Sequence, residues 1–188
     1  MRIARSKVLL ARGDLVGAAA DSELALTMAR RAKDPQALVP AIVARILIET
    51  TVGNVEASSE LMAELDRIST SVVIQTSRYL VTWWTAHAAG LSKESSAWPG
   101  RDDTPVGSAA RAVEEGDPDR AAELFATMGA RPNEAYARLL AAERDFAAGD
   151  RAAGERQLER ALTFYREVRA TYFIERAESL RAAIRPEG

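Results

Sequence analysis

A glycine followed by an acidic or amide residue recurs along this chain of 188 residues. Glycine readily takes the left-handed backbone conformation that closes an α-helix, and Asp or Asn caps the first turn of the helix that follows. Each such pair therefore predicts a tight turn between two helices. The pairs are Gly13-Asp14, Gly53-Asn54, Gly116-Asp117 and Gly149-Asp150, and Gly90-Leu91 takes the remaining place without the cap.

The spacing of these glycines predicts a repeated unit of two helices. Successive glycines are 40, 37, 26 and 33 residues apart, which brackets the 34-residue period of a helix–turn–helix repeat. Two helices that cross closely need small side chains at the crossing. The residue five positions after each glycine is small in every repeat, and we expect helix crossings at Ala18, Ser58, Ala121 and Gly154.

Composition favours an all-α fold. Alanine, the best helix former, occurs 37 times, whereas aromatic residues make up 6% of the chain. Start signals at Asp34-Pro35 and Asp117-Pro118, and a stop at Pro99-Gly100, add to the glycine turns. We expect a single domain over residues 1–184 and a tail at 185–188. The expected hairpins cover residues 2–32, 35–68, 71–98, 105–128 and 133–168, and a final capping helix covers 171–184.

The segment from Tyr136 to Asp150, continued through residues 157–162, resembles the tetratricopeptide repeat (TPR) family. The resemblance extends over nearly the whole chain in a degenerate form. No repeat has the family's tryptophan early in its first helix, and Asp145 stands where the family favours tyrosine. The resemblance implies a right-handed superhelix of antiparallel hairpins. The C-terminal part looks like the repeats of large bacterial regulators, namely transcription activators of the LuxR and maltose-activator kind and ATPase-fused adenylate cyclases.

In TPR proteins the first helix of each hairpin lines a concave groove, and this resemblance identifies candidate contact residues here. Trp84 and His87 stand at groove-facing places, whereas the neighbouring Trp83 is expected in the core because tryptophan is costly to expose. A mostly apolar groove suits an amphipathic helix or a peptide. The expected contacts are Leu47, Leu80, Trp84, His87, Val113, Glu143 and Phe146.

The residue types argue against several other functions. The chain has no cysteine, its one histidine is His87, and it contains no phosphate-binding glycine loop. We therefore expect no catalytic site, no metal and no cofactor. A net charge of −2 gives no basic surface for nucleic acid. The longest apolar stretch, residues 38–52, is interrupted by Arg45 and Glu49, so we expect no membrane span and a cytoplasmic location.

The sequence thus favours a non-catalytic module that binds a protein partner or peptide, as part of a signalling or transcription regulator. Two alternatives remain open. One is a small-molecule sensor, in which Trp84 would stack on a sugar-like ligand. The other is a homodimer formed through the groove or the terminal helix. Because Met1 falls inside the first repeat, we also expect its apolar edge to be covered, by upstream sequence in a longer parent or by a second copy.

Overall fold

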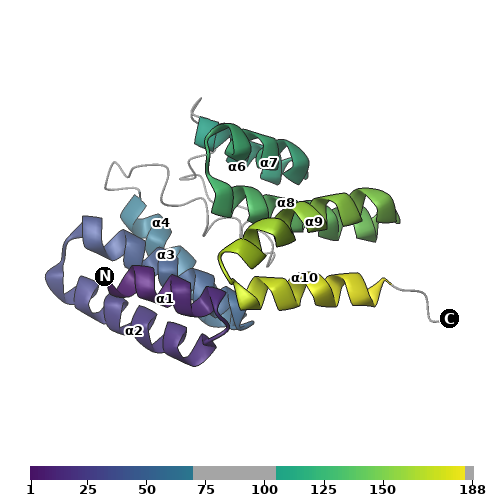
Figure 1. Ribbon diagram of the computed structural model, residues 1–188. Coiled ribbons are helices and arrows are strands. Elements are labelled where there is room, and N and C mark those ends of the chain that lie inside the picture. The colour runs from purple at the N-terminus through teal and green to yellow at the C-terminus, as the bar shows by residue number, and fades with distance from the viewer. Residues whose placement is uncertain (70–104, 185–188) are drawn as a thin grey trace. The chain divides into compact units, whose positions relative to one another are not determined.

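The computed structural model describes residues 1–69 and 105–184, and these residues are helical with no strand (Figure 1). The all-α prediction is therefore confirmed for the described part of the chain. The expected hairpin at 71–98 lies outside it. The helices are α1 (Arg2–Ala11), α2 (Leu15–Ala32), α3 (Pro35–Thr51), α4 (Val55–Ser69), α6 (Pro105–Glu114), α7 (Pro118–Thr127), α8 (Arg131–Ala147), α9 (Arg151–Glu167) and α10 (Thr171–Ala183).

The glycine turns have the geometry that the sequence predicts. Gly13, Gly53, Gly116 and Gly149 have φ values of +80°, +80°, +77° and +82°. The amide of the capping residue donates to the carbonyl five residues earlier, at 2.9 Å from Asp14 to Leu9 and from Asp150 to Asp145. The side chains of Asp14 and Asp150 accept the amides of Gly17 and Ala153 at 2.8 and 2.9 Å. One short motif thus ends a helix and starts its partner.

The turns that join one hairpin to the next use different residues. Lys33 before α3 and Arg169 before α10 have positive φ, at +54° and +55°, and Gly129 does the same before α8. Ala130 and Ala170 follow in the capping position and provide no side-chain cap. The sequence marks the turn before α3 by Asp34-Pro35, but it does not mark the turn at Arg169, because Arg rarely takes a left-handed backbone. Even so, every described hairpin and the final helix begin and end within two residues of their expected bounds.

The chain divides into two compact units, residues 1–10 with 14–99 and residues 11–13 with 100–188. In the first unit α3 is the central helix, and it packs against both α2 and α4. Its side chains Val39, Ile42 and Ile46 are buried against Leu26 of α2 and Leu65 of α4. A smaller cluster joins α1, α2 and α3 through Leu10, Ala18 and Ile48.

In the second unit α8 and α9 form the most extensive helix pair, and α7 and α10 pack beside α8 and α9. Leu139, Leu158 and Leu162 are fully buried in their core. The predicted final helix is present as α10, and its Phe173 and Leu180 pack against this core, with Ala177 buried. A single domain over residues 1–184 and a right-handed superhelix remain predictions.

The residues expected at helix crossings are buried. Ala18, Ser58 and Ala121 each have 0% exposure, and Gly154 is buried in α9. A Cβ atom built on Gly154 would stand 2.4 Å from two ring atoms of Phe146 in α8, so only glycine fits beside that ring. Ser58 makes a hydrogen bond with Thr50 across its hairpin, 3.1 Å between the two hydroxyl oxygens.

Candidate functional site

Three of the predicted contact residues, Leu80, Trp84 and His87, lie outside the described residues. Of the other four, Val113 is buried, and Leu47, Glu143 and Phe146 are each in contact with a neighbouring helix. Leu47 of α3 is partly buried against the cluster of Leu10, Ala18 and Ile48. Glu143 of α8 makes an ion pair with Arg176 of α10, 2.6 Å between nitrogen and oxygen.

Val113 and Phe146 share one position, three residues before the turn glycine, and so do Leu10 and Thr50. Val113 is buried, and Phe146 lies against Gly154 of its own hairpin. Thr50 bonds to Ser58, and Leu10 clusters with Ala18. In the hairpins α1–α2, α3–α4 and α8–α9 this position therefore faces the second helix, next to the residue five places after the glycine. His87 has the same spacing from Gly90.

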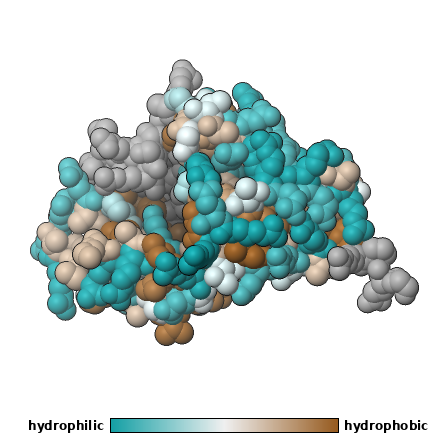
Figure 2. Space-filling model, viewed as in Figure 1, coloured by the Kyte–Doolittle hydropathy of each residue, from teal (hydrophilic) through white to brown (hydrophobic). Residues whose placement is uncertain are grey.

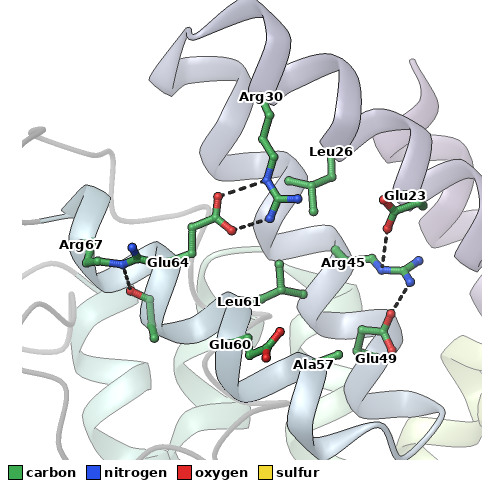
Figure 3. Close-up of a pocket in the computed structure, with 11 residues that line it drawn as sticks. Glu23, Leu26, Arg30, Arg45, Glu49, Ala57, Glu60, Leu61, Glu64 and Arg67 are labelled. Carbon is green, nitrogen blue, oxygen red and sulfur yellow. Dashed lines mark hydrogen bonds and ion pairs between the residues drawn. The ribbon is translucent and has the colours of Figure 1, made fainter.

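The first unit contains a groove that the sequence did not predict. It lies between α2 and α4, above α3, with a volume of about 530 Å³ (Figure 3). We refer to it as the α2–α4 groove. Its described lining residues are Glu23, Leu26 and Arg30 of α2, Arg45 and Glu49 of α3, and Ala57, Glu60, Leu61, Ala63, Glu64 and Arg67 of α4.

Ion pairs hold the polar walls of the α2–α4 groove. Arg30 of α2 reaches Glu64 of α4 with two hydrogen bonds, of 2.5 and 3.2 Å, and so links the two walls at one end. The hydrogen bond to Glu64 raises the pKa of Arg30. At the other end Arg45 lies between Glu23, at 3.6 Å, and Glu49.

The central pair of Arg45 and Glu49 is fixed from several sides. Arg45 donates to the carbonyl of Ala19 at 2.7 Å and to the hydroxyl of Ser22 at 3.0 Å. The side chain of Glu49, a residue that is 5% exposed, accepts a further hydrogen bond of 2.9 Å from the side-chain amide of Asn54. A buried carboxylate with this many donors is a satisfied and rigid group. The α3 side of the groove is therefore preorganised.

The groove also has an apolar part and an available carboxylate. Leu26 and Leu61 lie between the two sets of ion pairs in Figure 3, and both belong to the buried core cluster. Glu60 is exposed and makes no ion pair with any described residue. The α4 residues that line the groove run from Ala57 to Arg67, which is about 15 Å at 1.5 Å per residue. The groove is thus elongated along the helix axis.

A second cluster, in the second unit, is aromatic and closed. Tyr165 of α9 stacks on Phe173 of α10 with ring centres 4.9 Å apart, and Tyr136 of α8 meets Phe173 edge-on at 6.3 Å. The guanidinium of Arg176 lies 5.9 Å from the Tyr136 ring. Burial raises the pKa of both tyrosines. These contacts attach α10 to the α8–α9 hairpin.

One signal in the sequence could have located the α2–α4 groove. Arg45 and Glu49 interrupt an otherwise apolar segment of the most buried helix, one turn apart. Charges at such positions need partners on the helices that cover them. The predicted contact residue of α3, Leu47, lies on the opposite side of the helix from Arg45 and Glu49.

Among the described residues, no group of three or more His, Cys, Asp or Glu side chains could hold a metal ion. No described helix is both long and apolar enough to cross a membrane.

Comparison with known proteins gives no relative for this chain: no protein-family model, no curated protein and no solved structure matches it.

Proposed function

We propose that this chain is a non-catalytic interaction module of the cytoplasm, built from TPR-like hairpins in a right-handed superhelix, and that it binds a helix or peptide segment of a partner protein. The observation that carries the proposal is the α2–α4 groove. It is elongated, apolar at Leu26 and Leu61, and bordered by charges on both walls. A peptide with apolar anchors and flanking charges matches this arrangement.

The described lining residues include four glutamates and three arginines (Arg30, Arg45 and Arg67), and this net charge of −1 favours a basic segment. Arg30 and Arg45 are already neutralised by Glu64, Glu23 and Glu49. Glu60 is the exposed carboxylate that no described residue neutralises. A lysine or arginine of the partner would form an ion pair with Glu60. An apolar side chain of the partner, one helical turn away, would pack on Leu26 and Leu61. Membership of a signalling or transcription regulator is part of the same proposal, and rests on the resemblance of the repeats alone.

The test is selection of binding peptides from a randomised library, followed by fluorescence anisotropy on the selected peptides. Ala57 is half-buried at the third position of α4 and lines the groove. We expect Ala57→Arg to fill the groove and weaken peptide binding by about tenfold or more. The matched control is Ala153→Arg, which places the same side chain at the equivalent half-buried position of α9 and should leave binding unchanged.

A charge variant tests the class of peptide. Glu60→Lys should disfavour basic peptides and select acidic ones in their place. Peptides whose binding is insensitive to both Ala57→Arg and Glu60→Lys would show that the α2–α4 groove is not the binding site, and would overturn the proposal.

A further inference from the structure

The solvent-facing side of α2 is apolar. Val16, Leu24 and Met28 are 83%, 41% and 57% exposed, and Ala20 is exposed between them. These four residues are spaced by four, so they follow one another along the helix surface. We refer to them as the α2 stripe. Brown and tan surface interrupts the teal over the first unit in Figure 2. Contiguous exposed apolar surface of this kind is typical of an interaction site.

The second helices of the other described hairpins have no such stripe. When the four hairpins are aligned on their turn glycines, the places of Val16, Ala20 and Leu24 are polar in eight of nine cases. The place of Met28 is apolar in α4 (Ile68) and α9 (Phe164), but both side chains are half-buried there. At the positions of Val16, Ala20 and Leu24 these helices have Glu56, Glu60 and Glu64 in α4, Asp119, Glu123 and Thr127 in α7, and Ala152, Arg156 and Arg160 in α9. The apolar surface is therefore a property of α2 and not of the repeat.

The stripe is self-complementary when two copies of α2 run antiparallel. A two-fold axis at the level of Ser22 places Val16 opposite Met28 and Ala20 opposite Leu24. Small residues then meet larger ones, as helix packing requires. The half-buried Gly17 falls opposite Thr27 in the same register and allows close approach.

The charges at the two ends of α2 agree with this direction. Asp14 caps the N-terminus, and Arg31 stands on the exposed side near the C-terminus. Neither makes an ion pair with a described residue. In an antiparallel pair each Arg31 comes next to the Asp14 of the other copy, and the helix dipoles are opposed. A parallel pair would place Arg31 beside Arg31.

We propose that α2 packs against α2 of a second copy of this chain, antiparallel, through Val16, Ala20, Leu24 and Met28. One helix face is smaller than the ~800 Å² per partner of a standard interface. The association is therefore weak, in the micromolar range, and depends on concentration. It uses the outer side of α2 and leaves the α2–α4 groove open for a peptide.

Light scattering and sedimentation over a range of concentrations test the proposal. We expect the full chain to pass from monomer to dimer. The double variant Ala20→Arg with Leu24→Arg gives α2 the residues of α9 and should raise the dissociation constant about tenfold or more. The matched control is Val168→Arg, an exposed apolar residue at 46% in the second unit, which should dimerise like the original chain. Circular dichroism confirms that each variant is folded.

Disulfide trapping tests the register. The chain has no cysteine, so Ala20→Cys and Leu24→Cys each introduce a single thiol. When the two variants are mixed in equal amounts and oxidised, random pairing would give twice as much mixed disulfide as either homodisulfide, and the antiparallel register predicts a clear excess of mixed disulfide over that ratio. A chain that stays monomeric at all concentrations would overturn the proposal, and so would equal dissociation by Val168→Arg, or faster homodisulfide formation.

Discussion

The hairpins α1–α2 and α8–α9 share one turn but differ on both sides of their second helix. Both turn through Gly-Asp with φ near +80°, and both cross at the residues three before and five after the glycine. The first hairpin has Leu10 and Ala18 there, and the second has Phe146 and Gly154. Phe146 is larger than its counterpart Leu10, and it faces Gly154, which is smaller than its counterpart Ala18. The fold therefore constrains the combined size of the two side chains more than the size of either one.

The outer sides of the same two helices have diverged further. The exposed places that are Ala20 and Leu24 in α2 are Arg156 and Arg160 in α9. Near the C-terminal end Arg31 of α2 has no described ion-pair partner, whereas its equivalent Glu167 of α9 is paired with Arg131. The turn and the crossing thus define a hairpin. The residues on the outer face of its second helix can be polar or apolar without changing the turn or the crossing.

The strongest test of the crossing is Gly154→Leu. The new side chain would occupy the space of the Phe146 ring, because even a Cβ would stand 2.4 Å from it. We expect a loss of roughly 1–3 kcal/mol in the free energy of unfolding, measured by chemical denaturation. Ala152→Leu on the exposed side of the same helix is the control, and should change that free energy by less than about 0.5 kcal/mol. Equal effects of the two variants would contradict a tight crossing.

A double-mutant cycle tests whether the crossing depends on the pair. Gly154→Ala alone should be destabilising because of the Phe146 ring, and Phe146→Leu alone should leave a small void. Together they recreate the Leu–Ala pair of the first hairpin. We expect the double variant to lose less stability than the sum of the single variants, by about 1 kcal/mol. Strict additivity would show that the two positions do not pack as a pair.

A third prediction concerns the inner side of α9, where Tyr165 occupies the place of Ala29 in α2. The hydroxyl of Tyr165 is buried and has no hydrogen-bond partner among the described residues. Since an unsatisfied buried hydroxyl is destabilising, Tyr165→Phe should raise the free energy of unfolding by about 1 kcal/mol.

Tyr136→Phe is the matched control for that substitution. Its hydroxyl interacts with Arg176, so its removal should lower the stability by about 1 kcal/mol. Thermal denaturation of the two variants should therefore give shifts of opposite sign. A destabilised Tyr165→Phe protein would imply that the hydroxyl is satisfied after all.

The same two hairpins show which features can be predicted from the sequence alone. The helices and the crossings were predictable, because a left-handed glycine with a cap and a small residue at a fixed distance are local features. The side-chain direction of the residue three before the glycine could not be predicted. The sequence allows Phe146 to face either a groove or its own hairpin, and only the structure shows the ring beside Gly154. The α2–α4 groove depends on pairs such as Arg30 with Glu64, 34 residues apart. Nothing local marks these two residues as partners.

The smallest expected effect concerns the ion pair of Arg131 with Glu167 at the end of α9. Both side chains are about half exposed, and the hydrogen bond from Arg131 lowers the pKa of Glu167. A carboxyl whose pKa is lower in the folded state stabilises the protein above its ordinary pKa, and this contribution is lost as the pH falls through the lowered value. Water and salt screen an exposed pair, so the contribution is slight.

Glu167→Gln should therefore lower the melting temperature slightly at pH 7 in low salt, and the difference from the original chain should disappear in strong acid or in molar salt. In α2 the equivalent substitution is Arg31→Gln, where no described partner is lost. It should leave the melting temperature of the dilute monomer unchanged at every pH, and should weaken only the concentration-dependent association. If Arg31→Gln destabilised the dilute monomer as well, Arg31 would have a partner within its own chain, and the contrast between the outer faces of α2 and α9 would no longer extend to their charges.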